Sequence, residues 1–407
     1  MNGHPVRLAR PPVAALSPVA QIGRAMFFDV RLSASGAMSC ATCHDPSFAY
    51  GPPNDRSVQL GGTDGAREGM RAVPSLRYLD RVPSFVIGPD QGDADAVPSV
   101  LGSWTRPVTK GPVTPKRAGA TTLPLVPWGG LFWDGRADSF QLQASGPLLN
   151  PAEMGNADAR SLASTFRALD YANRLARALG HLETESVPEG RLVDEALFAI
   201  ARFEFEDPSF HPYASKYDAW LEGKTALTAS ELRGLRVFED PAKGNCAACH
   251  LDRPTADGRP PLFTDWQYEA LGVPRNERLA LNHDRVDLGL CGPVRTDLRN
   301  QPEWCGMFRT PSLRNVTRRH AFFHNGVVHT LSDVMRFYNF RDVQPERVYP
   351  SGPDGQLRRF DDLPSGAARN LDVIDPPFNR RRGEPPPMTD QDIEDVIMFL
   401  GTLTDAD

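Results

Sequence analysis

The sequence contains no apolar run long enough for a membrane-spanning helix, and its first twenty residues lack the hydrophobic core of a secretory leader. It has no excess of basic residues either, since the formal net charge of the 407 residues is −6 at pH 7. Because nucleic-acid binding needs a basic face, we expect no nucleic-acid partner. Because no apolar run is long enough, we also expect no membrane span. If the protein is exported, its leader has been removed from this sequence.

Cysteine and histidine are scarce, with six and nine residues, yet they form one pattern twice. The pattern is C-x-x-C-H, present as "CATCH" at 40–44 and "CAACH" at 246–250. In this motif two thiols form thioethers with the haem vinyl groups and the histidine ligates iron. We therefore predict two covalently bound haem c groups. Their attachment residues are Cys40, Cys43 and His44 in the first motif and Cys246, Cys249 and His250 in the second.

Two other interpretations of the cysteines were considered. One C-x-x-C can be a thioredoxin-like redox pair, and two can form a four-cysteine zinc site. A redox pair does not need a trailing histidine, and a zinc site does not explain why a histidine directly follows both second cysteines. The haem interpretation explains all six residues.

The remaining cysteines, Cys291 and Cys305, have thirteen residues between them. Attachment of haem c takes place outside the cytoplasm, where thiols oxidise. We therefore expect a periplasmic protein with a Cys291–Cys305 disulfide, which would contribute about 3 kcal/mol by the loop-entropy relation.

The segments before the two haem motifs resemble each other. "QIGRAMFFDVRLSASGAMSCATCH" and "ELRGLRVFEDPAKGNCAACH" both predict an amphipathic helix, a polar loop and the haem turn. Ser17 before Pro18 marks the first helix start, the capping box from Thr228 to Glu231 marks the second, and Thr389 begins a third amphipathic helix near the C-terminus. This pattern predicts a mostly α protein made of two tandem class I cytochrome c-like domains with long loops.

The sixth ligand of each iron decides between electron carrier and enzyme, because an iron with a vacant position binds peroxide and a six-coordinate iron passes electrons. Between His44 and residue 133 there is no other histidine, and Met70 is the only methionine. We therefore expect a vacant sixth position at the first haem. Ligation by Met70 is the alternative.

Several landmarks follow one another along nearly the whole chain: "GRAMFFDVRLSASGAMSCATCH", "MRAVPSLRYL", "FWDGRAD", "FRTPSLRNV", "FFHNG" and "FYNFRD". In this order they resemble the bacterial dihaem cytochrome c peroxidase family, including its MauG branch. The stretch at 189–223 looks like a helix followed by a connecting loop, which places one domain at 1–205, a linker at 206–225 and a second domain at 226–407. The resemblance implies that the N-terminal domain is peroxidatic and that the C-terminal domain transfers electrons. It also implies hydrogen peroxide as substrate, with an electron donor or protein substrate that the sequence does not identify.

The resemblance assigns residues around the first haem. In the family the Trp of "FWDGR" lies between the two haems, and Gln, Pro and Glu ten, fourteen and twenty positions later line the peroxide pocket. These positions are Trp133, Gln143, Pro147 and Glu153. Cleavage of a bound peroxide needs a proton moved from one oxygen to the other, which suits Glu153 as the acid-base group. The family's reductively activated members carry a distal histidine after the first haem, and this sequence has none there.

For the second haem, the family places the sixth ligand fourteen residues after the His of "FFHNG", as Met in ordinary peroxidases and Tyr in the MauG branch. Here that position is Tyr338, with Met335 as the competing ligand. A Tyr ligand lowers the reduction potential and implies a bis-Fe(IV)-type state that oxidises a protein or small-molecule donor. The alternatives are a conventional cytochrome c peroxidase fed by a soluble redox protein and a non-catalytic dihaem electron-transfer cytochrome.

The family also commonly binds calcium between its haem domains, through an Asn in "R-N-x-P-[ST]" and backbone carbonyls. The matching text here is "RAVPS", so Ala72 replaces the Asn. The carbonyls would come from the backbone of residues 319–321, and a backbone carbonyl is present whatever the side chain is. The sequence therefore leaves calcium open.

Overall fold

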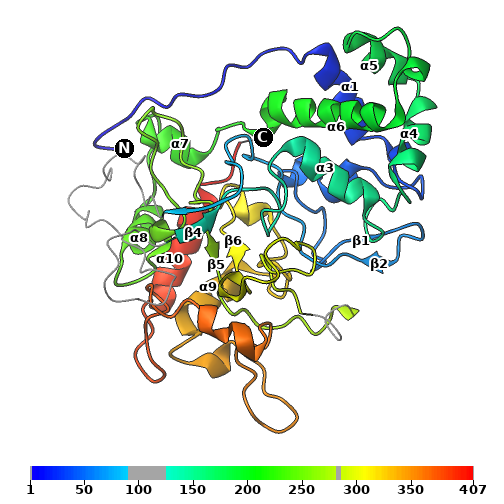
Figure 1. Cartoon of the computed structure of the whole chain (residues 1–407). Helices are drawn as coiled ribbons and strands as arrows, with labels where there is room; N and C mark the ends of the chain where they lie inside the picture. Colours follow the sequence, from blue (N-terminus) through cyan, green and yellow to red (C-terminus); the bar gives the residue numbers. More distant parts are fainter. Residues whose placement is uncertain (1, 90–124, 281–285, 407) are drawn as a thin grey trace.

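A computed structural model of the chain describes residues 2–89, 125–280 and 286–406, and helices are its main regular elements, as predicted (Figure 1). The helices are α1 (Pro18–Phe27), α2 (Cys40–Cys43), α3 (Phe140–Leu149), α4 (Ala159–Arg167), α5 (Ala172–Ala178), α6 (Glu189–Glu206), α7 (Lys216–Leu221), α8 (Ala229–Glu239), α9 (Leu331–Phe340) and α10 (Asp390–Gly401). The strands are β1 (Leu60–Gly61), β2 (Arg67–Glu68), β3 (Val86–Pro89), β4 (Leu125–Trp128), β5 (Tyr268–Glu269) and β6 (Phe308–Arg309).

Three helix starts follow the predicted capping residues. The Ser17 side chain accepts a hydrogen bond from the Ala20 N–H at the start of α1. Thr228 and Thr389 each form a complete capping box, at α8 and α10. Each cap satisfies a backbone N–H that the helix itself leaves unpaired, worth about 1 kcal/mol.

Two helix pairs cross at glycine. A Cβ on Gly23 of α1 would lie 1.8 Å from the Ala199 carbonyl oxygen of α6, and a Cβ on Gly234 of α8 would lie 1.9 Å from the Asp395 carbonyl oxygen of α10. Both glycines occupy the same place in the repeated segment found in the sequence. The two halves are thus built around equivalent close crossings, and Figure 1 shows the pairs on different sides of the molecule.

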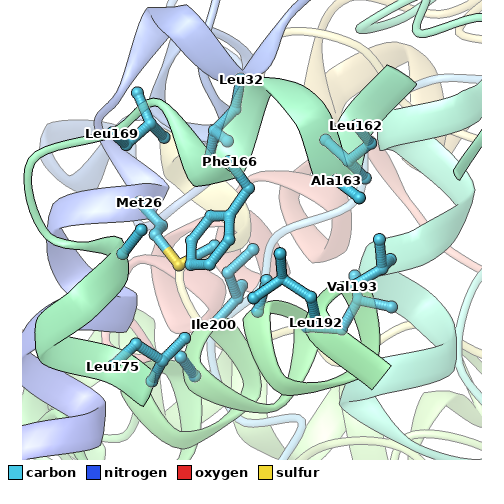
Figure 2. Close-up of a cluster of buried hydrophobic side chains, with 14 of the residues drawn as sticks. Met26, Leu32, Leu162, Ala163, Phe166, Leu169, Leu175, Leu192, Val193 and Ile200 are labelled. Atoms are coloured by element: carbon cyan, nitrogen blue, oxygen red, sulfur yellow. The ribbon is translucent and has the colours of Figure 1, made fainter. Parts of the chain in front are cut away.

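Each helix pair has its own apolar core. In the first half α1, α3, α4, α5 and α6 enclose a cluster shown in Figure 2, which includes Met26, Leu32, Leu162, Phe166, Leu175, Leu192 and Ile200. In the second half α7, α8 and α10 surround another, which includes Trp220, Leu235, Phe238, Phe263, Val396 and Phe399. Burial of each such side chain contributes about 1.5–3 kcal/mol, so each half has the means to hold its own haem motif.

The described strands pair antiparallel in twos: β1 with β2, β3 with β4, and β5 with β6. The longest pair runs from Val86 opposite Trp128 to Pro89 opposite Leu125. This ladder ends just before the "FWDGR" segment and so fixes where that segment enters the interior. No helix in the described part of the chain has the length and apolarity needed to cross a membrane.

The predicted disulfide is present between Cys291 and Cys305, whose Cα atoms lie 4.9 Å apart. The region 206–225, expected to be a connecting loop, includes helix α7, because Ser215 caps it and its apolar residues join the second core.

The N-terminal segment packs on the second half before the chain reaches α1 (Figure 1). The N–H of Val6 donates to the Leu221 carbonyl, and Arg10 forms an ion pair of 2.7 Å with Glu222.

Candidate functional site

The first haem motif borders a cavity of about 170 Å³ between α2, α3, α6 and the loops at 59–76 and 131–136. All the residues that the sequence assigned to the first haem line it: Cys40, Cys43, His44, Trp133, Gln143, Pro147 and Glu153. Met70, the alternative ligand, lines it too. Residues up to 113 positions apart (40 to 153) thus meet around one space.

His44 is oriented for ligation through one ring nitrogen. It ends α2, where its N–H donates to the Cys40 carbonyl, and its Nδ1 lies 2.9 Å from the Tyr50 carbonyl oxygen. Because a carbonyl only accepts, Nδ1 carries the proton and Nε2 keeps the lone pair for a metal. Burial lowers the pKa of His44 to about 4, which favours the neutral imidazole that binds iron.

The thiols are set for covalent attachment rather than for thiolate chemistry. Burial raises the pKa of Cys40 to about 12 and that of Cys43 to about 11. A buried neutral thioether fits these positions. Among the described residues, no group of three or more His, Cys, Asp or Glu side chains is arranged to hold a metal ion.

Gln143 and Pro147 lie one turn apart on α3, whose N-cap is Ser139. Gln143 is buried and both side chains reach the cavity. Because proline has no N–H, the Gln143 carbonyl receives no helical hydrogen bond from position 147. Because Gln143 and Pro147 both line the cavity, α3 contributes one polar and one apolar residue to the same space.

Glu153 lies in the turn after α3 and is held from two sides. The Asn150 side-chain amide donates to its Oε1 at 2.5 Å, and its backbone carbonyl accepts from the Gly62 N–H at 2.7 Å. A Cβ at Gly61 would lie 2.4 Å from the Ala152 carbonyl oxygen, so only glycine permits this approach. Burial raises the pKa of Glu153, while Asn150 and Arg136 oppose the shift.

Trp133 lines both the first cavity and the second one. Its indole Nε1–H donates to the Ala72 carbonyl at 2.8 Å, which fixes the ring plane. The next residue, Asp134, is fully buried and ion-paired with Arg71 at 2.7 Å and with Arg136 at 2.8 Å. These pairs hold the "WDGR" turn between the two cavities.

The second haem motif borders a cavity of about 230 Å³. Its lining includes Cys246, Cys249, His250, Met335 and Tyr338. The Nδ1 of His250 lies 2.9 Å from the Phe263 carbonyl oxygen, the same arrangement as at the first motif.

Tyr338 and Met335 both come from α9, one turn apart, and reach this cavity. Burial raises the pKa of Tyr338, and the Cys249 and Cys246 thiols that line the same cavity raise it further. Met335 belongs to the apolar core of the second half. The two side chains therefore share the cavity but differ in their surroundings.

The donor sets fit haem c at both cavities: two thiols and an Nε2 lone pair border an enclosed space in each. When haem is bound, an iron with a vacant position activates peroxide and an iron with two axial ligands passes electrons.

Sequence patterns gave no role to the charged side chains of Glu204 of α6 at the first cavity, Arg319 at the second, or Arg309, which lines both. Glu204 lies outside every quoted motif, Arg309 lies in "FRTPSLRNV", and Arg319 was expected to offer only its backbone carbonyl. No periodicity or spacing in the sequence marks a single buried charge.

Comparisons with known proteins agree with this geometry. A family model described as di-haem cytochrome c peroxidase matches residues 17–226. The methylamine utilization protein MauG of Paracoccus denitrificans is 32% identical over 408 aligned positions, covering 98% of this chain and 90% of that protein. The cytochrome c551 peroxidase of Nitrosomonas europaea is 26% identical over 337, covering 80% and 75%.

A crystal structure of the diheme peroxidase BthA from Burkholderia thailandensis superposes with a TM-score of 0.79 and 35% sequence identity. The match covers 100% of this chain and 95% of that one. The chain therefore belongs to the di-haem cytochrome c peroxidase family, whose members carry two haem c groups, and it is an oxidoreductase that acts on peroxide.

Proposed function

We propose that this chain uses hydrogen peroxide to bring its two haems to a shared high-valent state of the bis-Fe(IV) type, which then oxidises a protein or small-molecule donor. The observation that carries this proposal is the position of Trp133, whose side chain lines both cavities. An aromatic ring in contact with both sites is suited to carry charge between them. The proposed location is the periplasm, in keeping with haem c attachment and with the Cys291–Cys305 disulfide.

At the first cavity, we assign Glu153 the transfer of a proton between the two peroxide oxygens. Its raised pKa keeps the carboxyl group protonated at higher pH than an ordinary glutamate, so it is suited to donate. Gln143 positions the oxygen or a water molecule, and Pro147 supplies an apolar wall. The sixth position of the His44 haem is proposed to be vacant, with Met70 beside the cavity but not ligating.

At the second cavity, we assign Tyr338 as the sixth ligand of the His250 haem. The support is that Tyr338 lines the second cavity together with Cys246 and Cys249, whereas Met335 packs in the apolar core of the second half. An oxygen ligand stabilises ferric and higher states, so this haem is suited to store an oxidising equivalent.

The proposed architecture is two tandem cytochrome c-like domains, at 1–205 and 226–407, with 206–225 between them. The equivalent glycine crossings of α1 with α6 and of α8 with α10 support the tandem arrangement. Residues 2–10 and α7 pack with the second half, so both contribute to joining the domains.

A second candidate function is a conventional peroxidase that reduces peroxide to water with electrons from a soluble redox protein. Met335 favours it, because this residue also lines the second cavity and a thioether ligand would raise the reduction potential. A non-catalytic cytochrome is excluded by the family assignment.

The experiment that tests the proposal replaces Glu153 with Gln in the protein carrying both haems. Because general acid-base catalysis contributes about 10²–10⁴-fold, the Glu153→Gln variant should react with peroxide slower by a factor in that range while both haem spectra stay nearly intact. Stopped-flow absorbance measures the rate.

Two controls accompany this experiment. Glu189→Gln, on the exposed start of α6, should react at the wild-type rate. Met70→Leu should leave the ferric spectrum of the first haem unchanged. Wild-type peroxide kinetics in Glu153→Gln would remove Glu153 from the mechanism, and a spectral change in Met70→Leu would show that the sixth position is filled.

A further inference from the structure

Arg319 places a cation at the junction of the two cavities. It directly follows the short 3-10 helix Val316–Arg318, and its side chain lines the second cavity. Its Nη2 donates to the carbonyl oxygens of Val73 at 3.1 Å and Ala321 at 3.2 Å. One guanidinium thus joins the second half of the chain to the segment at 72–74.

The carbonyls of the 72–74 segment hold groups from both sites. The Ala72 carbonyl accepts from the indole of Trp133, and the Val73 carbonyl accepts from Arg319. This segment therefore sets the positions of the bridging tryptophan and the arginine together.

The donors at this place do not fit calcium. Calcium needs six to eight oxygen ligands, often including carboxylates. Ala72 offers a methyl group and a carbonyl that already accepts a hydrogen bond. The Val73 and Ala321 carbonyls accept from Arg319, whose positive charge would repel a dication.

Arg319 keeps its charge and has no carboxylate partner within the described part of the chain. Burial lowers its pKa to about 10, so the guanidinium remains protonated near neutral pH. A cation here disfavours additional positive charge in the second cavity, which Arg319 lines.

We propose that the Arg319 guanidinium takes the place of a calcium ion as the cation that holds the 72–74 segment at the junction of the two haem sites. Arg319 is therefore a positioning residue, and the protein keeps its folded junction without calcium. Its charge also raises the reduction potential of the His250 haem, whose cavity it lines, because a nearby cation favours the ferrous form. This inference is independent of which donor the enzyme oxidises.

The first test measures calcium in the purified protein carrying both haems. Mass spectrometry of metals after dialysis should find far less than one calcium ion per chain. The Tm and haem spectra should be unchanged by the chelator EGTA and by added calcium chloride. One retained calcium ion per chain, or a Tm that falls with EGTA and recovers with calcium, would overturn the proposal.

The second test compares Arg319→Gln, Arg319→Lys and a control, Arg160→Gln. The side chain of Arg160 is 83% exposed, and this residue lines neither cavity. Loss of two charge-assisted hydrogen bonds should lower the Tm of Arg319→Gln by on the order of 5 °C. The potential of the His250 haem should fall in Arg319→Gln and recover toward the wild-type value in Arg319→Lys, while Arg160→Gln should match the wild type.

Potentiometric titration of each haem separates positioning by charge from simple packing. Wild-type Tm and wild-type potentials in Arg319→Gln would overturn the proposal, as would an equal fall of potential in Arg319→Lys and Arg319→Gln. If Arg319→Gln does not accumulate as folded protein, the lysine variant and the calcium measurement on the wild type still decide the matter.

Discussion

Glu153, which is partly buried, and Glu204, which is buried, carry two carboxyl groups at the same cavity, and they differ in their partners. Glu153 receives a hydrogen bond from Asn150, whereas Oε2 of Glu204 has no hydrogen-bond partner among the residues that the structure describes. Burial raises the pKa of Glu204 from its ordinary value of 4.5 to about 8. The folded protein therefore holds the Glu204 proton over a pH range in which the unfolded chain releases it.

This difference predicts a pH dependence of stability. Between about pH 4.5 and 8 the native state binds one proton more than the unfolded state at Glu204. As the pH rises through this range, the contribution of Glu204 to the free energy of unfolding should therefore fall by about 1.4 kcal/mol per pH unit. Glu204→Gln should remove this contribution. Urea unfolding at several pH values measures it, and equal slopes in the variant and the wild type would contradict the assignment.

Tyr338 and Met335 make opposite predictions for the second haem. If Tyr338 is the ligand, Tyr338→Met should raise the reduction potential of that haem, because a thioether favours the ferrous state more than an oxygen ligand does. Met335→Leu, which conserves volume, should leave the potential unchanged. Potentiometry of both variants decides; a change confined to Met335→Leu would assign the ligand to methionine.

At the scale of elements, the two glycine crossings make the next prediction. Gly23→Ala would place a Cβ against the backbone of α6, and Gly234→Ala would place a Cβ against the backbone of α10. Because the nearest atoms are backbone atoms, the clash is not relieved by rotating a side chain. Each should cost at least about 1–3 kcal/mol. Thermal unfolding followed by circular dichroism measures the loss.

A matched control for the glycine variants is Gly190→Ala, in the first turn of α6. A Cβ there meets no atom within 4 Å, so this variant should gain about 0.4–1 kcal/mol from reduced freedom of the unfolded chain. Equal Tm values for all three alanine variants would contradict the close-crossing account.

The helix starts that the sequence predicted are those marked by contacts between residues close together in the chain. Ser17, Thr228 and Thr389 are caps in the structure because capping is a contact between residues three apart, which a sequence displays directly. Helix α7 was missed because its six residues are too few to show a helical period. The Gly61 contact with the Glu153 turn joins distant segments, so no local pattern announced it.

At the scale of the whole molecule, the residues that motif and resemblance named for each haem line the same two cavities. What they did not give is how the halves are joined. Arg10 pairs with Glu222 across 212 positions, and Arg319 reaches Val73 across 246. Such contacts depend on the folded path of both segments, and each segment alone looks like an ordinary loop.

The central claim is that peroxide reacts at the His44 haem and that Trp133 shares the resulting charge with the His250 haem. The most direct measurement mixes the diferric protein with peroxide in a stopped-flow spectrometer, with no donor present. The account predicts a long-lived near-infrared charge-resonance band in the wild type and its loss in Trp133→Phe. No near-infrared band, with peroxide consumed rapidly only when a reduced cytochrome is added, would contradict it.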